Sequence, residues 1–162
     1  MENQHLRWKD YHHQLYQIYH GLIALTLVPF ALLFLEWDSG NFQLEVSFSD
    51  VFFILVAQLI WVVGFACWYV GKGEKVQYEI KEGMTLEEKL KEFKKKNVYK
   101  YLLLAFAGCI AAFAMWLQPT YIFVIAYFVV LVQYSFLRPS EDKIVRDMRL
   151  TKEDRRRLHQ EE

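Results

Sequence analysis

The sequence predicts an all-α membrane protein: four transmembrane helices in an up-down bundle, with helical extensions on the cytoplasmic side. The first observation behind this prediction is a set of long apolar runs, which cover 18–35, 51–70, 98–117 and 121–137. Each run is close to the ~20 residues that cross a ~30 Å hydrocarbon core as a helix. A soluble fold would have to bury four apolar helices on every side, and a chain of 162 residues is too small to cover them.

The second observation is that charge is segregated between the runs. All 19 Lys and Arg residues fall before residue 18, in 72–100 or from residue 138 onward. The polar gap 36–50 and the turn around 118–121 hold none of them. Basic residues stay on the cytoplasmic side during membrane insertion, so we expect both termini and the loop 71–97 to be cytoplasmic.

The length of the chain and its balance of acidic and basic residues give expectations for its domains and its partners. The chain has a one-domain length, so we expect a four-span bundle over 1–137 and a cytoplasmic helical tail over 138–162. The formal net charge is +0, with acids interleaved among the bases of the inner segments. This balance gives no indication of nucleic-acid binding. We expect a bacterial-type inner membrane as the location and the lipid bilayer as the first partner.

Helical extensions are predicted for two of the spans and for the tail. Apolar residues recur at spacings of three and four before the first span, at Trp8, Tyr11, Leu15, Ile18 and Leu22. Thr85 followed by Glu88 is a capping-box pattern, which predicts a helix from residue 86 through the third span. At ~1.5 Å per residue such a helix is about 48 Å long. Ser140 and Thr151 are the predicted caps of two short tail helices.

Polar groups inside the predicted spans are few. The amides and hydroxyls at depth are Thr26, Gln58, Gln133 and Ser135, together with Tyr hydroxyls, and Lys100 is counted with the basic segment 72–100. We therefore expect no charged side chain inside a span. Proton-coupled pumps need a titratable group at depth, so this expectation counts against them. No catalytic residue is predicted.

Histidines give one candidate for cofactor binding. His5, His12, His13 and His20 lie in the N-terminal segment, but their spacings do not place metal ligands three or four residues apart on one helix. We therefore predict no metal site from this segment alone. His20 is the one candidate haem ligand, near the inner interface, and the identity of any cofactor stays open.

Acidic residues gather in the predicted outer loop, and the cysteines do not pair. The loop acids are Glu36, Asp38, Glu45 and Asp50. They could hold a cation, although ordinary outer-face charge is the favoured interpretation. Cys67 and Cys109 are predicted at different depths in the bilayer, which argues against a disulfide between them.

Small residues indicate close helix packing in two of the spans. The third span holds small residues four apart, in the pairs Ala107/Ala111 and Gly108/Ala112. The second span holds small residues seven apart: Ala57, Gly64 and Gly71. Either set fits an intramolecular contact, which we favour, or a contact between subunits of a homo-oligomer.

Three function classes remain open. The favoured one is a non-catalytic subunit or scaffold that docks a protein partner through its cytoplasmic helices. The first alternative is a homo-oligomeric channel or passive transporter. The second is a membrane enzyme, or a protein that binds haem, quinone or lipid, using the aromatic bundle interior.

Overall fold

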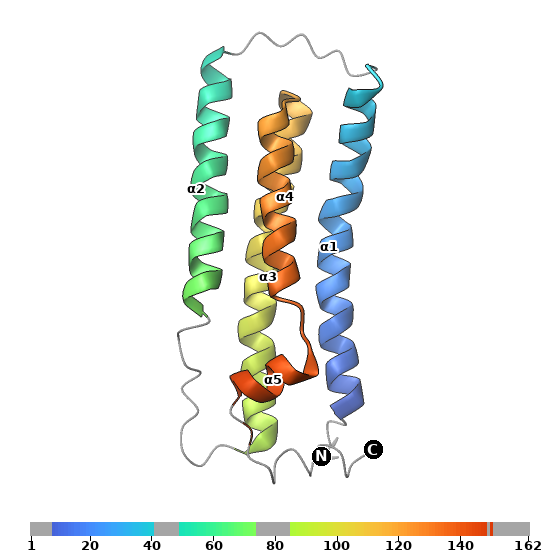
Figure 1. The fold of residues 1–162 in the computed structure, drawn as a ribbon, viewed down its shortest axis with the longest axis vertical. Helices are drawn as coiled ribbons and strands as arrows, with labels where there is room; N and C mark the ends of the chain where they lie inside the picture. The colour runs from blue at the N-terminus through green and yellow to red at the C-terminus, as the bar shows by residue number, and fades with distance from the viewer. Residues whose placement is uncertain (1–7, 41–48, 74–84, 149, 151–162) are drawn as a thin grey trace, which may run out of the picture.

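The protein is an all-α bundle of four main helices packed together. The computed structural model describes residues 8–40, 49–73, 85–148 and 150. The helices are α1 (Trp8–Asp38), α2 (Ser49–Gly73), α3 (Leu86–Leu117), α4 (Tyr121–Phe136) and α5 (Glu141–Asp147). Figure 1 shows that α1 to α4 run alternately up and down, with α1 and α2 flanking the pair α3 and α4. The predicted all-α fold of four packed helices is confirmed.

The start of α3 confirms the predicted capping box. The Glu88 amide donates to the Thr85 hydroxyl at 3.4 Å, and the Thr85 amide donates to the Glu88 carboxylate at 2.9 Å. These two bonds satisfy backbone donors that the first helical turn leaves without partners. The helix then continues for 32 residues through the third predicted span. One stiff element therefore joins the extension to the apolar part of the bundle.

The extension of α3 packs against the first turns of α1. Tyr11 and Leu15 are buried, which confirms the apolar face predicted for this part of α1. The Tyr11 hydroxyl donates to the Leu90 carbonyl of α3 at 2.8 Å. Phe93, one turn further along α3, is buried as well. The apolar core of the bundle thus continues between the two extensions.

The tail begins with α5, which crosses beneath the end of α4 (Figure 1). Ser140 precedes α5 as predicted, but its side chain makes no capping bond. Its carbonyl accepts from the Ile144 amide at 3.0 Å, which is the ordinary first bond of the helix. Ile144 and Met148 are buried. The Lys143 ammonium donates to the Phe136 carbonyl of α4 at 2.7 Å. The predicted second tail helix at Thr151 lies outside the described residues.

The two outer helices differ in how they pack. α1 packs mainly on α3, whereas α2 packs on α3 and α4. Among the side chains of α2 that the structure describes (56–69), Leu59, Val63 and Ala66 are buried, and most of the residues between them are exposed. α2 is therefore a peripheral helix with a broad free face.

Two of the helices, α1 and α3, are long and apolar enough to cross a membrane, by length and composition. Their apolar windows have a mean hydropathy of 2.1 and 1.8, and only 17% of the α1 window is buried. α2 and α4 contribute shorter apolar stretches, Val56–Tyr69 and Tyr121–Phe136. The 16 residues of α4 span about 24 Å.

Candidate functional site

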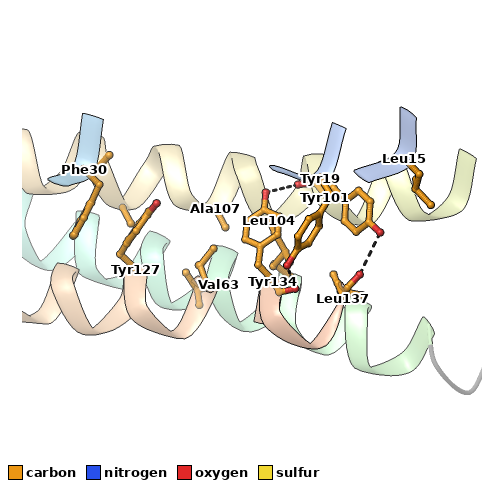
Figure 2. Close-up of a cluster of buried hydrophobic side chains, with 14 of the residues drawn as sticks. Leu15, Tyr19, Phe30, Val63, Tyr101, Leu104, Ala107, Tyr127, Tyr134 and Leu137 are labelled. Carbon is orange, nitrogen blue, oxygen red and sulfur yellow. Dashed lines mark hydrogen bonds between the residues drawn. The ribbon is translucent and has the colours of Figure 1, made fainter. Parts of the chain in front are cut away.

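Three tyrosines link α1, α3 and α4 inside the bundle. Tyr19 donates to the Tyr134 carbonyl at 2.9 Å, and Tyr134 donates to the Tyr101 carbonyl at 2.8 Å. Tyr101 in turn donates to the Leu137 carbonyl at 3.2 Å (Figure 2). The Tyr19 ring meets the other two edge to face, at centroid distances of 5.3 and 6.0 Å. Each of the three hydroxyls donates to a backbone carbonyl, so this cluster joins α1, α3 and α4.

A second polar contact joins α1 to α4 further along the bundle. Thr26 is buried, and its hydroxyl donates to the Ile23 carbonyl at 3.1 Å. The same oxygen accepts from the Tyr127 hydroxyl at 3.1 Å, and Phe30 stacks on the Tyr127 ring at 3.9 Å. Thr26 is therefore the innermost of the predicted polar residues of the spans. Gln133 is half-buried, and Gln58 is exposed on α2.

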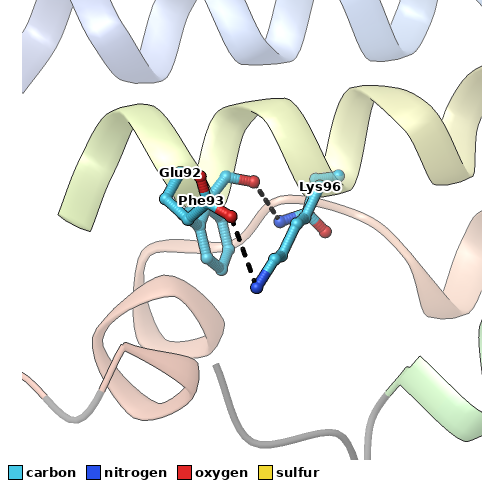
Figure 3. A network of polar contacts seen from close by, with 4 residues as sticks. Glu92, Phe93 and Lys96 are labelled. Carbon is cyan, nitrogen blue, oxygen red and sulfur yellow. Dashed lines mark hydrogen bonds and ion pairs between the residues drawn. The ribbon is translucent and has the colours of Figure 1, made fainter. Parts of the chain in front are cut away.

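Lys100 corrects the expectation that no span contains a charge. It lies within the predicted span 98–117 and is only 8% exposed. Its neighbour on the same helix face, Asn97, is 4% exposed and donates to the Phe93 carbonyl at 3.0 Å (Figure 3). A signal for this burial existed, because positions 90, 93, 97 and 100 follow the spacing of one helix face. Lys100 also continues the basic segment 72–100, and its burial is therefore not evident from the charge pattern.

His12, His13 and His20 lie along the outside of α1, and His5 lies outside the described residues. The ring nitrogen Nε2 of His12 lies 3.2 Å from the Pro139 carbonyl, and because a carbonyl only accepts, this nitrogen donates. His13 bonds Gln17 at 2.9 Å. His20 is exposed. A haem bound to His20 would therefore sit outside the bundle and not among its helices. Within the described parts of the chain, no three His, Cys, Asp or Glu residues are grouped to hold a metal.

The two small-residue sets have different surroundings. The set on α3 is buried, and a Cβ added to Gly108 would lie 3.2 Å from Cβ of Thr26. Gly108, with Ala107, Ala111 and Ala112 around it, therefore faces neighbouring helices of the same chain and offers no surface to a second subunit. On α2, Ala57 and Gly64 are exposed, and a Cβ at Gly64 would meet nothing within 4 Å. Gly71 lies in α2, and its surroundings are outside the described part.

The predicted outer acids are described in part. Glu36 and Asp38 are exposed at the end of α1. Asp50 belongs to the first turn of α2, with its side chain outside the described part, and Glu45 lies outside the described residues. Both cysteines are free: Cys67 is half-buried and Cys109 is exposed.

Polar surface is concentrated on the three packed segments at the α5 end, which we call the platform: residues 8–17 of α1, residues 86–97 of α3, and α5. Lys94 donates to the Gln14 side chain at 2.8 Å, which ties α3 to α1. Lys96 lies 3.4 Å from the Glu92 carboxylate one turn earlier (Figure 3). The exposed charged residues of the platform include Glu87, Glu88, Lys91, Lys95 and Arg146.

Comparison of the chain with protein-family models, curated proteins and solved structures finds no match. The platform is the candidate functional surface, because its exposed charged side chains lie over buried apolar side chains that hold its three segments together. These buried side chains are Tyr11, Leu15, Leu90, Phe93, Ile144 and Met148.

Proposed function

We propose that the chain is an integral protein of a bacterial-type inner membrane, with four spans and both termini in the cytoplasm. The main support is that large apolar side chains are exposed around the whole bundle. Examples from each main helix are Leu25, Leu32, Ile60, Trp61, Phe106, Phe113, Ile125 and Phe128, all at least half exposed. Monomeric soluble proteins rarely expose contiguous apolar surface on this scale, whereas lipid chains would cover it without cost.

The orientation follows from charge. All 19 bases and 15 of the 19 acids lie in the segments assigned to the cytoplasm; the other acids are Glu36, Asp38, Glu45 and Asp50. The excess of Lys and Arg on one side is what determines the direction of insertion. This assignment places the platform in the cytoplasm.

Within this placement we propose that the protein is a non-catalytic subunit or scaffold that docks a protein partner on the platform. The observation that carries the proposal is that the segments of the platform pack on one another within this chain. The Tyr11 hydroxyl of α1 donates to the Leu90 carbonyl of α3 at 2.8 Å, and Ile144 of α5 is buried. The 12 residues of α3 from Leu86 to Asn97 project about 18 Å beyond the apolar part. A rigid surface loses little conformational entropy on binding, which favours affinity.

A homo-oligomeric channel or passive transporter is the second candidate function. The exposed Ala57 and Gly64 on the free face of α2 favour it, because small residues let helices of two subunits approach closely. In this arrangement the contact would form within the membrane, on α2, and not on the platform.

Purification in mild detergent tests the two candidates together. The scaffold proposal expects a partner protein in a fixed ratio with the wild type. Lys91→Glu with Lys95→Glu, on the exposed face of α3, should remove this partner, while Glu36→Lys at the other end of the bundle should retain it. A homo-oligomer that conducts ions in vesicles, with no partner and no effect of the α3 variant, would contradict the scaffold and support the channel.

A further inference from the structure

Basic and aromatic side chains meet where α1 runs beside the link from α4 to α5. We call this site the corner; it comprises Arg138 of the link and His12, Tyr16 and His20 of α1. Two hydrogen bonds tie the segments: Tyr19 to the Tyr134 carbonyl at 2.9 Å, and His12 to the Pro139 carbonyl at 3.2 Å. Arg138 lies between these two attachment points along the chain and is exposed. Its guanidinium is close enough to Tyr19 for its charge to act on the hydroxyl.

Aromatic rings of α1 continue this corner. His12, Tyr16 and His20 follow one another by one helical turn, with ring centroids 6.1 Å and then 4.2 Å apart. The His20 ring also meets the Tyr19 ring at 4.9 Å. The His20 ring therefore contacts Tyr19, and Arg138 belongs to the chain segment that Tyr19 and His12 hold against α1.

The corner lies at the edge of the apolar surface. Phe136, two residues before Arg138, is 67% exposed. Leu25, 63% exposed, follows His20 by five residues, or about 7.5 Å along the helix. In the proposed orientation this depth is the headgroup region of the inner leaflet.

We propose that Arg138, His20 and Tyr16 bind the phosphate of an anionic phospholipid in the inner leaflet. The planar guanidinium presents paired donors that match phosphate oxygens, and it keeps its charge at all physiological pH values. The imidazole and the phenol add a hydrogen-bond donor each. Basic sites between helices on the cytoplasmic side are suited to anionic headgroups.

The surface beside the corner suits an acyl chain. Ala24 and Leu27 follow His20 on the same face of α1, and both are exposed. An acyl chain attached to a phosphate at the corner would lie along these side chains. A lipid therefore fits better than a free anion, which would use the polar groups alone. This inference rests on the proposed membrane placement.

Native mass spectrometry of the full chain in detergent tests the inference, with phosphatidylglycerol and phosphatidylcholine as probes. We expect the wild type to retain one phosphatidylglycerol at least 10-fold more tightly than phosphatidylcholine, a difference of about 1.4 kcal/mol. Arg138→Gln combined with His20→Ala should remove this preference, and Arg138→Lys should keep part of it. Lys95→Gln removes the same charge from an exposed site on α3 and should behave as the wild type.

Several outcomes would overturn the inference. They are equal retention of the two lipids by the wild type, an unchanged preference in the double variant, and displacement of the lipid by equimolar inorganic phosphate. If Arg138→Gln with His20→Ala lowers the melting temperature, Arg138→Gln alone must still weaken the preference. Labelling of cysteines introduced at Ser39 and Ser140 in intact cells reports the membrane placement separately. Correct placement without lipid preference would overturn this inference alone.

Discussion

Gly108 and Gly64 look alike in sequence, but leucine at the two positions should have opposite effects on stability. Both are mid-helix glycines in predicted spans. An added Cβ at Gly108 would lie 3.2, 3.3 and 3.4 Å from three side-chain atoms of Thr26, whereas one at Gly64 would meet nothing within 4 Å. Replacing a helical glycine by alanine gains about 1 kcal/mol. At Gly64 nothing opposes this gain; at Gly108 the tight contact with Thr26 offsets it.

Leucine at the two positions should give a large difference in stability. At Gly108 it must displace α1, and overpacking of this kind costs about 1–3 kcal/mol. The shift would also break the bond from Tyr127 to Thr26, worth about 1 kcal/mol. The sum of about 2–4 kcal/mol corresponds to a fall in melting temperature of about 4–16 °C for a chain of this size. At Gly64 the leucine enters open surface and should cost nothing.

Thermal unfolding of both leucine variants and the wild type in one detergent measures this contrast. We expect a lower melting temperature for Gly108→Leu and an unchanged or higher one for Gly64→Leu. If Gly64→Leu destabilises the protein as much as Gly108→Leu, the description of α2 as a helix with a free face is wrong. If Gly108→Leu is neutral, the close approach of α1 and α3 is refuted.

Three further predictions concern topology, the α3 extension and the tyrosine cluster. In a variant without native cysteines, a cysteine at Ser39 should react with an impermeant thiol reagent in intact cells and one at Ser140 should not; the reverse pattern would invert the orientation. Thr85→Ala removes the capping bond and should cost about 1 kcal/mol of helix stability, seen as faster amide exchange over 86–97; unprotected amides in the wild type would contradict the extension. Tyr134→Phe loses one hydrogen bond, about 1 kcal/mol, and should lower the melting temperature by about 2–4 °C, whereas Tyr121→Phe, an exposed position, should not change it.

The helices were predictable because their signals are local. The apolar runs and the Thr85–Glu88 pattern place the main helices, and the structure has both the capping box and the continuous α3. The cap of α5 was predicted only in position, since a serine before a helix need not turn its hydroxyl toward the free amides. The Ser140 side chain makes no such bond.

The environment of side chains was less predictable, because it depends on which helix lies opposite. The spacing of small residues does not distinguish the buried Gly108 from the exposed Gly64. The tyrosine cluster was not predicted at all, since its acceptors are backbone carbonyls, which every residue has. The burial of Lys100 was not predicted, because Lys100 was grouped with the basic segment 72–100, although the spacing of positions 90, 93, 97 and 100 already indicated it.

The shortness of α4 has a consequence for the surrounding bilayer. Its 16 residues reach about 24 Å, some 6 Å less than a typical ~30 Å hydrocarbon core. In a membrane-spanning bundle the lipids beside α4 must thin to match it, at a cost of a fraction of a kcal/mol for each Å of mismatch. Tilting of α4 would shorten its reach across the membrane further. The rings of Tyr121 and Trp37, with centroids 4.8 Å apart, hold the Tyr121 end of α4 against α1. In such a membrane the protein would thin the bilayer only next to α4, and it would partition toward thinner bilayers.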